Sequence, residues 1–226
     1  MALTKYNYNS FDVTPVASKA LAFNSDADGF TTASAGNMVL IKELTASSDS
    51  TLSFVDGASD VVLDNTYPIY LFKFINIHPS STSRIKFQFN GSDDDSSHSY
   101  DVTKTTSVFR AYQYEGDTGA SLDYTDGNDI AQGTGFQEFY NSANYDNDAN
   151  GCGELWLFNP SSTTYVKHFM SNFSSDGRSS GGNIYELNEY VAGYFNTTAD
   201  ITAMQFKFES GNIDAGTIKL YGIKDS

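Results

Sequence analysis

Alternating acidic and amide side chains form the first half of a calcium-binding loop. Asp146, Asp148 and Asn150 stand at alternate positions before a glycine, as in the opening of an EF-hand loop, where a hard cation takes several oxygen ligands around a tight turn. The glutamate of a complete loop is missing, since Leu157 occupies the twelfth position. The segment Asn24–Gly29 has the same incomplete pattern. Calcium binding is one interpretation, and solvated turns rich in Asp and Asn are the other.

Carboxylates for acid and base catalysis are present, but their spacing selects no pair. Glycoside hydrolases use two carboxylates, and β-sandwich folds can contain such sites. Examples of glutamates that could form such a pair are Glu115, Glu138, Glu154, Glu186 and Glu189. His78, His98 and His168 are too far apart in sequence to form a short-range metal pair, and no segment resembles a nucleophile elbow. We therefore predict no catalytic residues, no enzyme activity and no cofactor, with calcium as the one metal considered.

Charge and cysteine content exclude several other classes. The formal charge of −15 would repel nucleic-acid phosphates and anionic membranes. Cys152 is the only cysteine, so an intramolecular disulfide is excluded. Lys5, Asn7 and Asp12 interrupt the first residues, from which we expect neither a secretory signal nor a membrane-spanning helix. We expect no nucleic-acid partner and no membrane partner.

The elements that must position these side chains are short β-strands. Runs rich in Ile, Val, Phe, Tyr and Thr alternate with clusters of Gly, Asn, Asp and Ser, a pattern typical of a β-sandwich or jelly roll. Helical periodicity is almost absent. The predicted strands are Met38–Leu44, Thr51–Val55, Tyr67–Ile77, Arg84–Asn90, Ser107–Tyr114, Gly153–Phe158, Thr164–Phe173, Ile201–Glu209 and Gly216–Ile223.

Four of these strands permit a more detailed prediction. Strict alternation in Arg84–Asn90 places Ile85, Phe87 and Phe89 on one buried face. Tyr67–Ile77 is almost continuously apolar, which indicates a central strand. The last two strands should form a hairpin with a long loop.

The chain divides into a leading segment and one sandwich domain. Residues 1–36 lack alternation and are predicted to be an extended arm, or alternatively an ordered lead-in to the sandwich. Residues 37–226 form the β-sandwich domain. Residues 115–153 within it are dense in Gly, Asn and Asp and should be a loop-rich insertion.

Several segments resemble virion structural proteins of tailed bacteriophages, particularly marine ones. The closing segment Ser210–Ile223 is similar to the final hairpin of such proteins. Other similar pieces follow in the same order along the chain: Lys5–Pro15, Phe87–Gly91 with Tyr100, Leu157–Pro160, and Ala192–Asn196 before Ile201. These motifs are turns and strands, so the resemblance transfers no catalytic residues.

The resemblance implies a component of the virion surface, assembled in the host cytoplasm through contacts with other capsid or tail proteins. Capsid decoration and a tail or fibre component are both open, and family analogy suggests a homo-oligomer such as a trimer. One alternative is a carbohydrate-binding module for a host surface glycan, assisted by calcium. The third hypothesis is a polysaccharide hydrolase.

Overall fold

The computed structural model describes residues 20–23, 26, 29–33 and 36–224. This part of the chain contains β-strands and no helix, and therefore no helix that could span a membrane. The strands are β1 (Ala20–Phe23), β2 (Phe30–Ala33), β3 (Met38–Thr45), β4 (Leu52–Val55), β5 (Ile69–Pro79), β6 (Phe87–Ser92), β7 (Lys104–Tyr114), β8 (Ala120–Tyr124), β9 (Gln137–Tyr140), β10 (Gly151–Phe158), β11 (Lys167–Arg178), β12 (Ile184–Phe195), β13 (Ala203–Phe208) and β14 (Ile213–Ile223).

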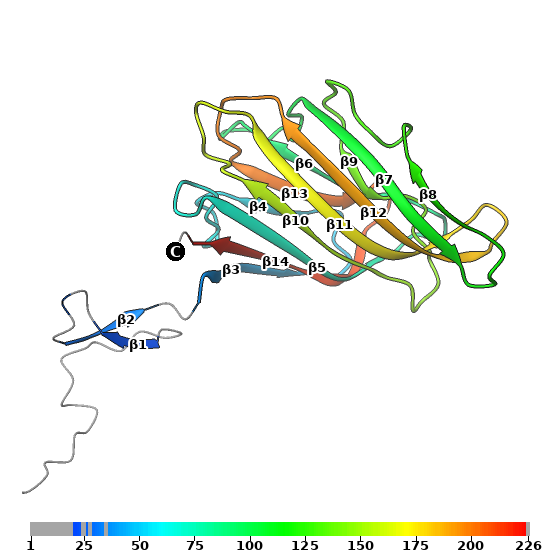
Figure 1. Cartoon of the computed structure of the whole chain (residues 1–226), viewed down its shortest axis with the longest axis horizontal. Helices are drawn as coiled ribbons and strands as arrows, with labels where there is room; N and C mark the ends of the chain where they lie inside the picture. The colour runs from blue at the N-terminus through cyan, green and yellow to red at the C-terminus, as the bar shows by residue number, and fades with distance from the viewer. Residues whose placement is uncertain (1–19, 24–25, 27–28, 34–35, 225–226) are drawn as a thin grey trace, which may run out of the picture.

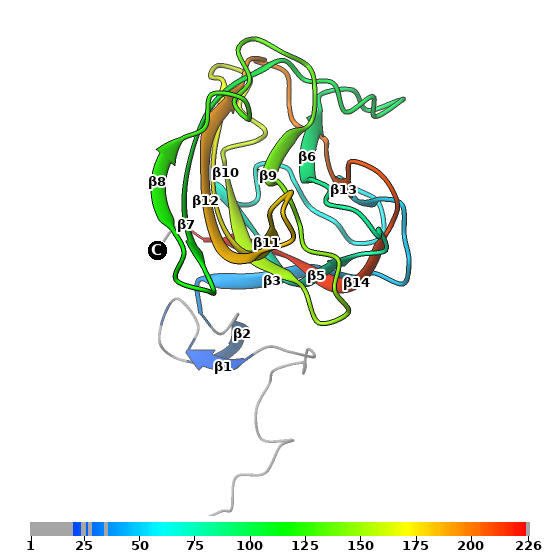
Figure 2. The ribbon, with the colours of Figure 1, turned by 90° about the vertical axis from the view of Figure 1, so that its right-hand side faces the viewer.

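Two antiparallel sheets form a β-sandwich (Figure 1). The larger sheet has eight strands in the order β3-β14-β5-β10-β11-β12-β7-β8, and the smaller has four in the order β4-β13-β6-β9. Figure 2 shows the smaller sheet lying inside the curve of the larger one. The predicted all-β sandwich is confirmed, and its jelly-roll form stays a prediction.

Aromatic side chains fill the space between the sheets. Phe74 of the large sheet is almost completely buried, and its ring lies 5.0 Å from Phe206 and 4.9 Å from Phe139 of the small sheet. Phe173 lies 5.3 Å from the Phe74 ring. Rings at these separations pack edge to face or offset, which adds to the stabilisation from burying their area.

The alternating pattern of Arg84–Asn90 correctly predicted which side chains face the core. Ile85, Phe87 and Phe89 are all buried, as predicted. The predicted central strand corresponds to β5, which lies between β14 and β10 in the large sheet. Its inward-facing side chains, among them Tyr70, Phe72 and Phe74, are buried in the core, whereas Ile75 is 41% exposed.

The predicted C-terminal hairpin is wrong. β13 belongs to the small sheet and pairs with β4 and β6, whereas β14 belongs to the large sheet and pairs with β3 and β5. The chain therefore crosses from one layer to the other between Phe208 and Ile213. Both strands have an apolar face, and these faces meet across the core instead of lying side by side in one sheet.

Residues 115–153 contain two strands in addition to loops. β8 continues the large sheet beyond β7, and β9 closes one side of the small sheet. β12 was also absent from the strands predicted by sequence. Its inward-facing positions alternate, but Glu189 and Gly193 interrupt the apolar pattern there.

The described residues of the leading segment contain one pair of strands. β1 pairs with β2, and these two strands form a sheet of their own. The stacked rings of Phe23 and Phe30 lie 5.1 Å apart. Most of the predicted arm, residues 1–19, lies outside the described residues.

Candidate functional site

The outer face of the large sheet is the surface that the small sheet does not cover. On β11, β12 and β7, side chains alternate between the core and this outer face. The register places Met170, Ala192 and Ser107 in one row across these three strands. The next row contains His168, Tyr194 and Thr105.

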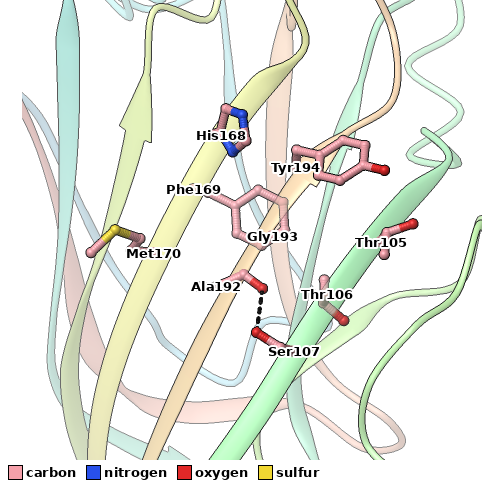
Figure 3. A pocket seen from close by; sticks show the side chains of 9 residues that line it. All are labelled: Thr105, Thr106, Ser107, His168, Phe169, Met170, Ala192, Gly193 and Tyr194. Carbon is pink, nitrogen blue, oxygen red and sulfur yellow. Dashed lines mark hydrogen bonds between the residues drawn. The ribbon is translucent and has the colours of Figure 1, made fainter.

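These two rows enclose a hollow of about 480 Å³ (Figure 3). Ala192 and Ser107 are small and leave space at its centre, while larger side chains stand around it. The rings of His168 and Tyr194 lie side by side on neighbouring strands, 5.7 Å apart at an interplanar angle of 54°. Met170 lies on β11, the same strand as His168, and is exposed. The hollow thus has a small-residue floor and partly aromatic walls.

Close strand packing beneath the hollow depends on Gly193. A Cβ atom at this position would lie 2.6 Å from the carbonyl oxygen of Thr105 and 2.7 Å from Cγ2 of Thr106. It would also touch the Phe169 ring at 3.0 Å. Only glycine leaves room for these neighbours, so this position holds β11, β12 and β7 in the geometry that forms the hollow.

The polar groups of the hollow are neutral hydroxyls and one imidazole. Ser107 Oγ donates to the carbonyl oxygen of Ala192 at 3.5 Å. Thr105 Oγ1 accepts from Gln132 Nε2 at 2.7 Å. The lining contains no carboxylate. This chemistry suits a neutral ligand with hydroxyl groups better than a cation.

A second group of exposed side chains lies beside the hollow, toward β8. The rings of Phe109 and Tyr190 stack 4.8 Å apart at 11°. Tyr124 is paired with Phe109 in the strand register, and Leu122 with Ala111. We call Phe109, Leu122, Tyr124 and Tyr190 the edge patch. Their exposed fractions are 46%, 73%, 59% and 37%. Exposed apolar side chains grouped in this way typically mark an interaction surface.

Two of the candidate glutamates come together between the sheets. Glu189 on β12 is completely buried, and its Oε1 accepts from Asn128 Nδ2 at 3.2 Å. Its Oε2 has no hydrogen-bond partner in the part of the chain that the structure describes. Burial, together with the charge of nearby Glu138, raises the pKa of Glu189 to about 7. Burial also raises the pKa of Glu138, although Lys86 forms an ion pair with it.

This carboxylate pair is enclosed, unlike the open cleft that a polysaccharide needs between an acid and a base. Glu154 and Glu186 lie on the outer face instead. Glu154 accepts from Trp156 Nε1 at 3.0 Å and pairs with Lys73 at 2.9 Å, and these contacts hold its pKa below the usual value. The geometry therefore favours a structural role for the buried pair, and hydrolase activity stays a hypothesis.

The side chains of Asp146 and Asn150, two of the three predicted calcium ligands, contact other protein groups. Both oxygens of Asp146 accept from Arg178 Nη1, at 3.0 and 2.9 Å. Asp148 and Asn150 line an open hollow of about 350 Å³ with Asp176 and Glu186 among its walls. Among the described residues, no three His, Cys, Asp or Glu side chains are grouped closely enough to hold a metal ion. Calcium binding here stays a prediction.

Most of the other predicted calcium loop, Asn24–Gly29, lies outside the described residues, with Asp26 and Gly29 as the described exceptions. Of the histidines, His78 Nδ1 lies 2.6 Å from the carbonyl oxygen of Ala149, a structural contact. His168 is exposed on β11, where it lines the hollow. The alternation of β11 and β12 was the sequence signal that could have located it.

Comparisons of the chain with protein-family models, curated proteins and solved structures found no match. The candidate site is therefore identified from the geometry of the structure alone. Its two parts are the hollow around Ala192 and the edge patch, both on the outer face of the large sheet.

Proposed function

We propose that this chain is a structural protein of a phage virion surface that functions through protein–protein assembly contacts. The observation that carries the proposal is the edge patch. Leu122 and Tyr124 expose more than half of their surface, beside the stacked pair of Phe109 and Tyr190. A chain of this acidity stays soluble at high copy number, so an apolar patch of this kind is best explained by a partner that covers it.

The sequence resemblance to virion structural proteins supports the setting of this proposal. The resembling segments include Phe87–Gly91 and Ala192–Asn196, which belong to β6 and β12 of the sandwich. The closing segment contributes β14, which lies inside the large sheet. These segments specify the scaffold, while the exposed patch supplies the contact. Capsid decoration and a tail or fibre position are both compatible with such a surface.

Localisation on intact particles tests the proposal. We expect an antibody against the folded chain to label purified particles, and labelling of the shell or of the tail would distinguish the two positions. A Phe109→Ser and Tyr190→Ser double variant should fold but be incorporated poorly. Met170→Ser, which changes an exposed apolar residue outside the edge patch, is the matched control. Absence of the protein from purified particles would refute the proposal.

Binding of a neutral glycan is the second candidate, and the hollow favours it. Sugar rings present apolar C–H faces and hydroxyls, which match the ring of Tyr194 and the polar groups of Ser107 and His168. We expect Ala192→Trp to fill the hollow and abolish glycan-array binding, while Leu122→Ser leaves that binding unchanged. Lack of binding to a broad array by the unmodified chain would count against this function. Loss of binding on addition of a chelator would instead point to the Asp146 loop.

A further inference from the structure

The large sheet ends in an open edge at β8. In the sheet order, β8 follows β7 and is the last strand, so only one of its sides is paired within the described part of the chain. An open edge presents unpaired N–H and C=O groups that can bind another strand. Figure 2 shows β8 at the margin of the large sheet, on the side away from the small sheet.

The hydrogen bonds at the two ends of β8 identify which backbone groups face outward. Tyr114 N donates to the carbonyl oxygen of Gly119 at 3.0 Å, and Thr125 N donates to that of Val108 at 2.8 Å. Because bonded and non-bonded positions alternate in an antiparallel pair, the odd-numbered residues of β8 direct their backbone groups toward β7. Ala120, Leu122 and Tyr124 therefore direct theirs toward the open edge.

The same three residues place their side chains on the outer face. Leu122 lies opposite Ala111 in the register, and Tyr124 lies opposite Phe109. Ser121 and Asp123 lie on the other face, where Ser121 Oγ donates to Asp123 Oδ1 at 2.7 Å. The strand contains no lysine or proline, the residues that commonly block an exposed edge.

The opposite edge of the large sheet is more strongly charged. Its edge strand β3 contains Lys42 and Glu43, and Glu43 forms an ion pair with Lys219 of β14 at 2.9 Å. Charged side chains discourage strand addition at an edge. Of the two edges, β8 is thus the better suited to pairing.

We propose that β8 pairs with β8 of a second copy, antiparallel and about a two-fold axis, with Leu122 opposite Leu122 of the second copy. In this register, all the outward backbone groups of Ala120, Leu122 and Tyr124 find partners. Tyr124 then lies opposite Ala120, so a large side chain meets a small one. The edge patches of both copies join into one continuous apolar band across the axis.

Charge favours this register over the adjacent register, in which Asp123 would lie on the axis. With Leu122 at the axis, Asp123 lies opposite Ser121, a residue that can donate a hydrogen bond. A shift that placed Asp123 on the axis would set two aspartates directly opposite each other, which is destabilising. The opposite shift would leave the outward groups of Tyr124 without strand partners. The net charge of −15 on each copy also predicts that added salt strengthens the pairing.

This self-association deepens the assembly function proposed above by naming a second copy as the partner. It is nevertheless tested in solution, whereas the location on a particle is tested by imaging, so each can fail alone. A two-fold pair predicts a dimer of the isolated full chain, in contrast to the trimer suggested by family analogy.

Sedimentation of the full chain over a concentration series is the first test. We expect a monomer–dimer equilibrium. Leu122→Pro should raise the dimer dissociation constant about tenfold or more, because it removes an outward N–H from each copy without removing a bond to β7. Leu122→Lys should act similarly by placing like charges on the axis. Leu122→Val keeps the N–H and should still dimerise. Melting curves would verify that every variant is folded.

Cross-linking provides the register. In a Cys152→Ser background, Leu122→Cys would bring two thiols together across the axis, since directly opposed bonded residues have Cα atoms about 5.5 Å apart. A short bis-maleimide reagent should therefore produce a covalent dimer. Ser121→Cys is the matched control and should cross-link less, because in this register Ser121 lies opposite Asp123 of the second copy and not opposite its own counterpart. A monomer at every concentration, a trimer, or a dimer unaffected by Leu122→Pro and Leu122→Lys would overturn the proposal.

Discussion

Replacing Glu189 with glutamine should remove much of the pH dependence of folding stability near neutral pH. Glu189 lies on the inward-facing side of β12 and is completely buried, and Asn128 donates a hydrogen bond to it. Burial raises its pKa from 4.5 to about 7, with Glu138 adding to the shift and Arg110 opposing it. Glutamine has nearly the same shape, and its amide oxygen can still accept from Asn128.

The sign follows from proton binding. A raised pKa means that the folded state holds the proton more tightly than the unfolded state between pH 4.5 and about 7. The free energy of unfolding therefore falls as pH rises through this window. A shift of this size corresponds to about 3 kcal/mol, at about 1.4 kcal/mol for each pH unit. The contribution is fully present below pH 4.5 and is lost above the pKa of the folded protein.

Urea unfolding at a series of pH values, followed by circular dichroism, measures this effect. We expect the Glu189→Gln variant to equal the unmodified protein near pH 4.5 and to exceed its stability near pH 8. Burial also raises the pKa of Glu138, so a smaller dependence of the same sign should persist. Glu186→Gln, on the outer face of the same strand, is the matched control. Parallel curves for Glu189→Gln and the unmodified protein would refute the reasoning.

Three further substitutions test the packing and the calcium loop through the free energy of unfolding. Gly193→Ala should cost about 1 to 3 kcal/mol because its Cβ would lie 2.6 Å from the carbonyl oxygen of Thr105, whereas Gly127→Ala, which meets no atom within 4 Å, should change little. Phe74→Ala should cost about 3 to 5 kcal/mol by leaving a cavity among the core rings, as measured by urea unfolding, and more than a change at any exposed aromatic residue. Asp146→Asn should cost less than about 1 kcal/mol, since its ion pair with Arg178 is partly exposed. A larger loss that appears only with added calcium would reveal a bound ion.

The sequence determined the class of fold and the faces of its most regular strands. Ile85, Phe87 and Phe89 could be assigned to the core because side chains alternate with a period of two along any strand. Composition excluded an intramolecular disulfide, because Cys152 is the only cysteine, and it led to the prediction that nucleic acid is not a partner. These conclusions depend on local geometry or on total charge, and neither requires knowledge of which strands are neighbours.

The tertiary structure decided which strands pair, and with that the location of the candidate site. β5 pairs with β10 and β14, which lie far from it in sequence, and β13 and β14 separate into different sheets although they are consecutive. The sequence did not distinguish Glu138 and Glu189 from its other glutamates, and only folding placed both between the sheets. The hollow around Ala192 and the open edge at β8 likewise arise from pairing between distant strands. Local periodicity specifies which side of a strand is apolar, but long-range contacts determine what that side meets.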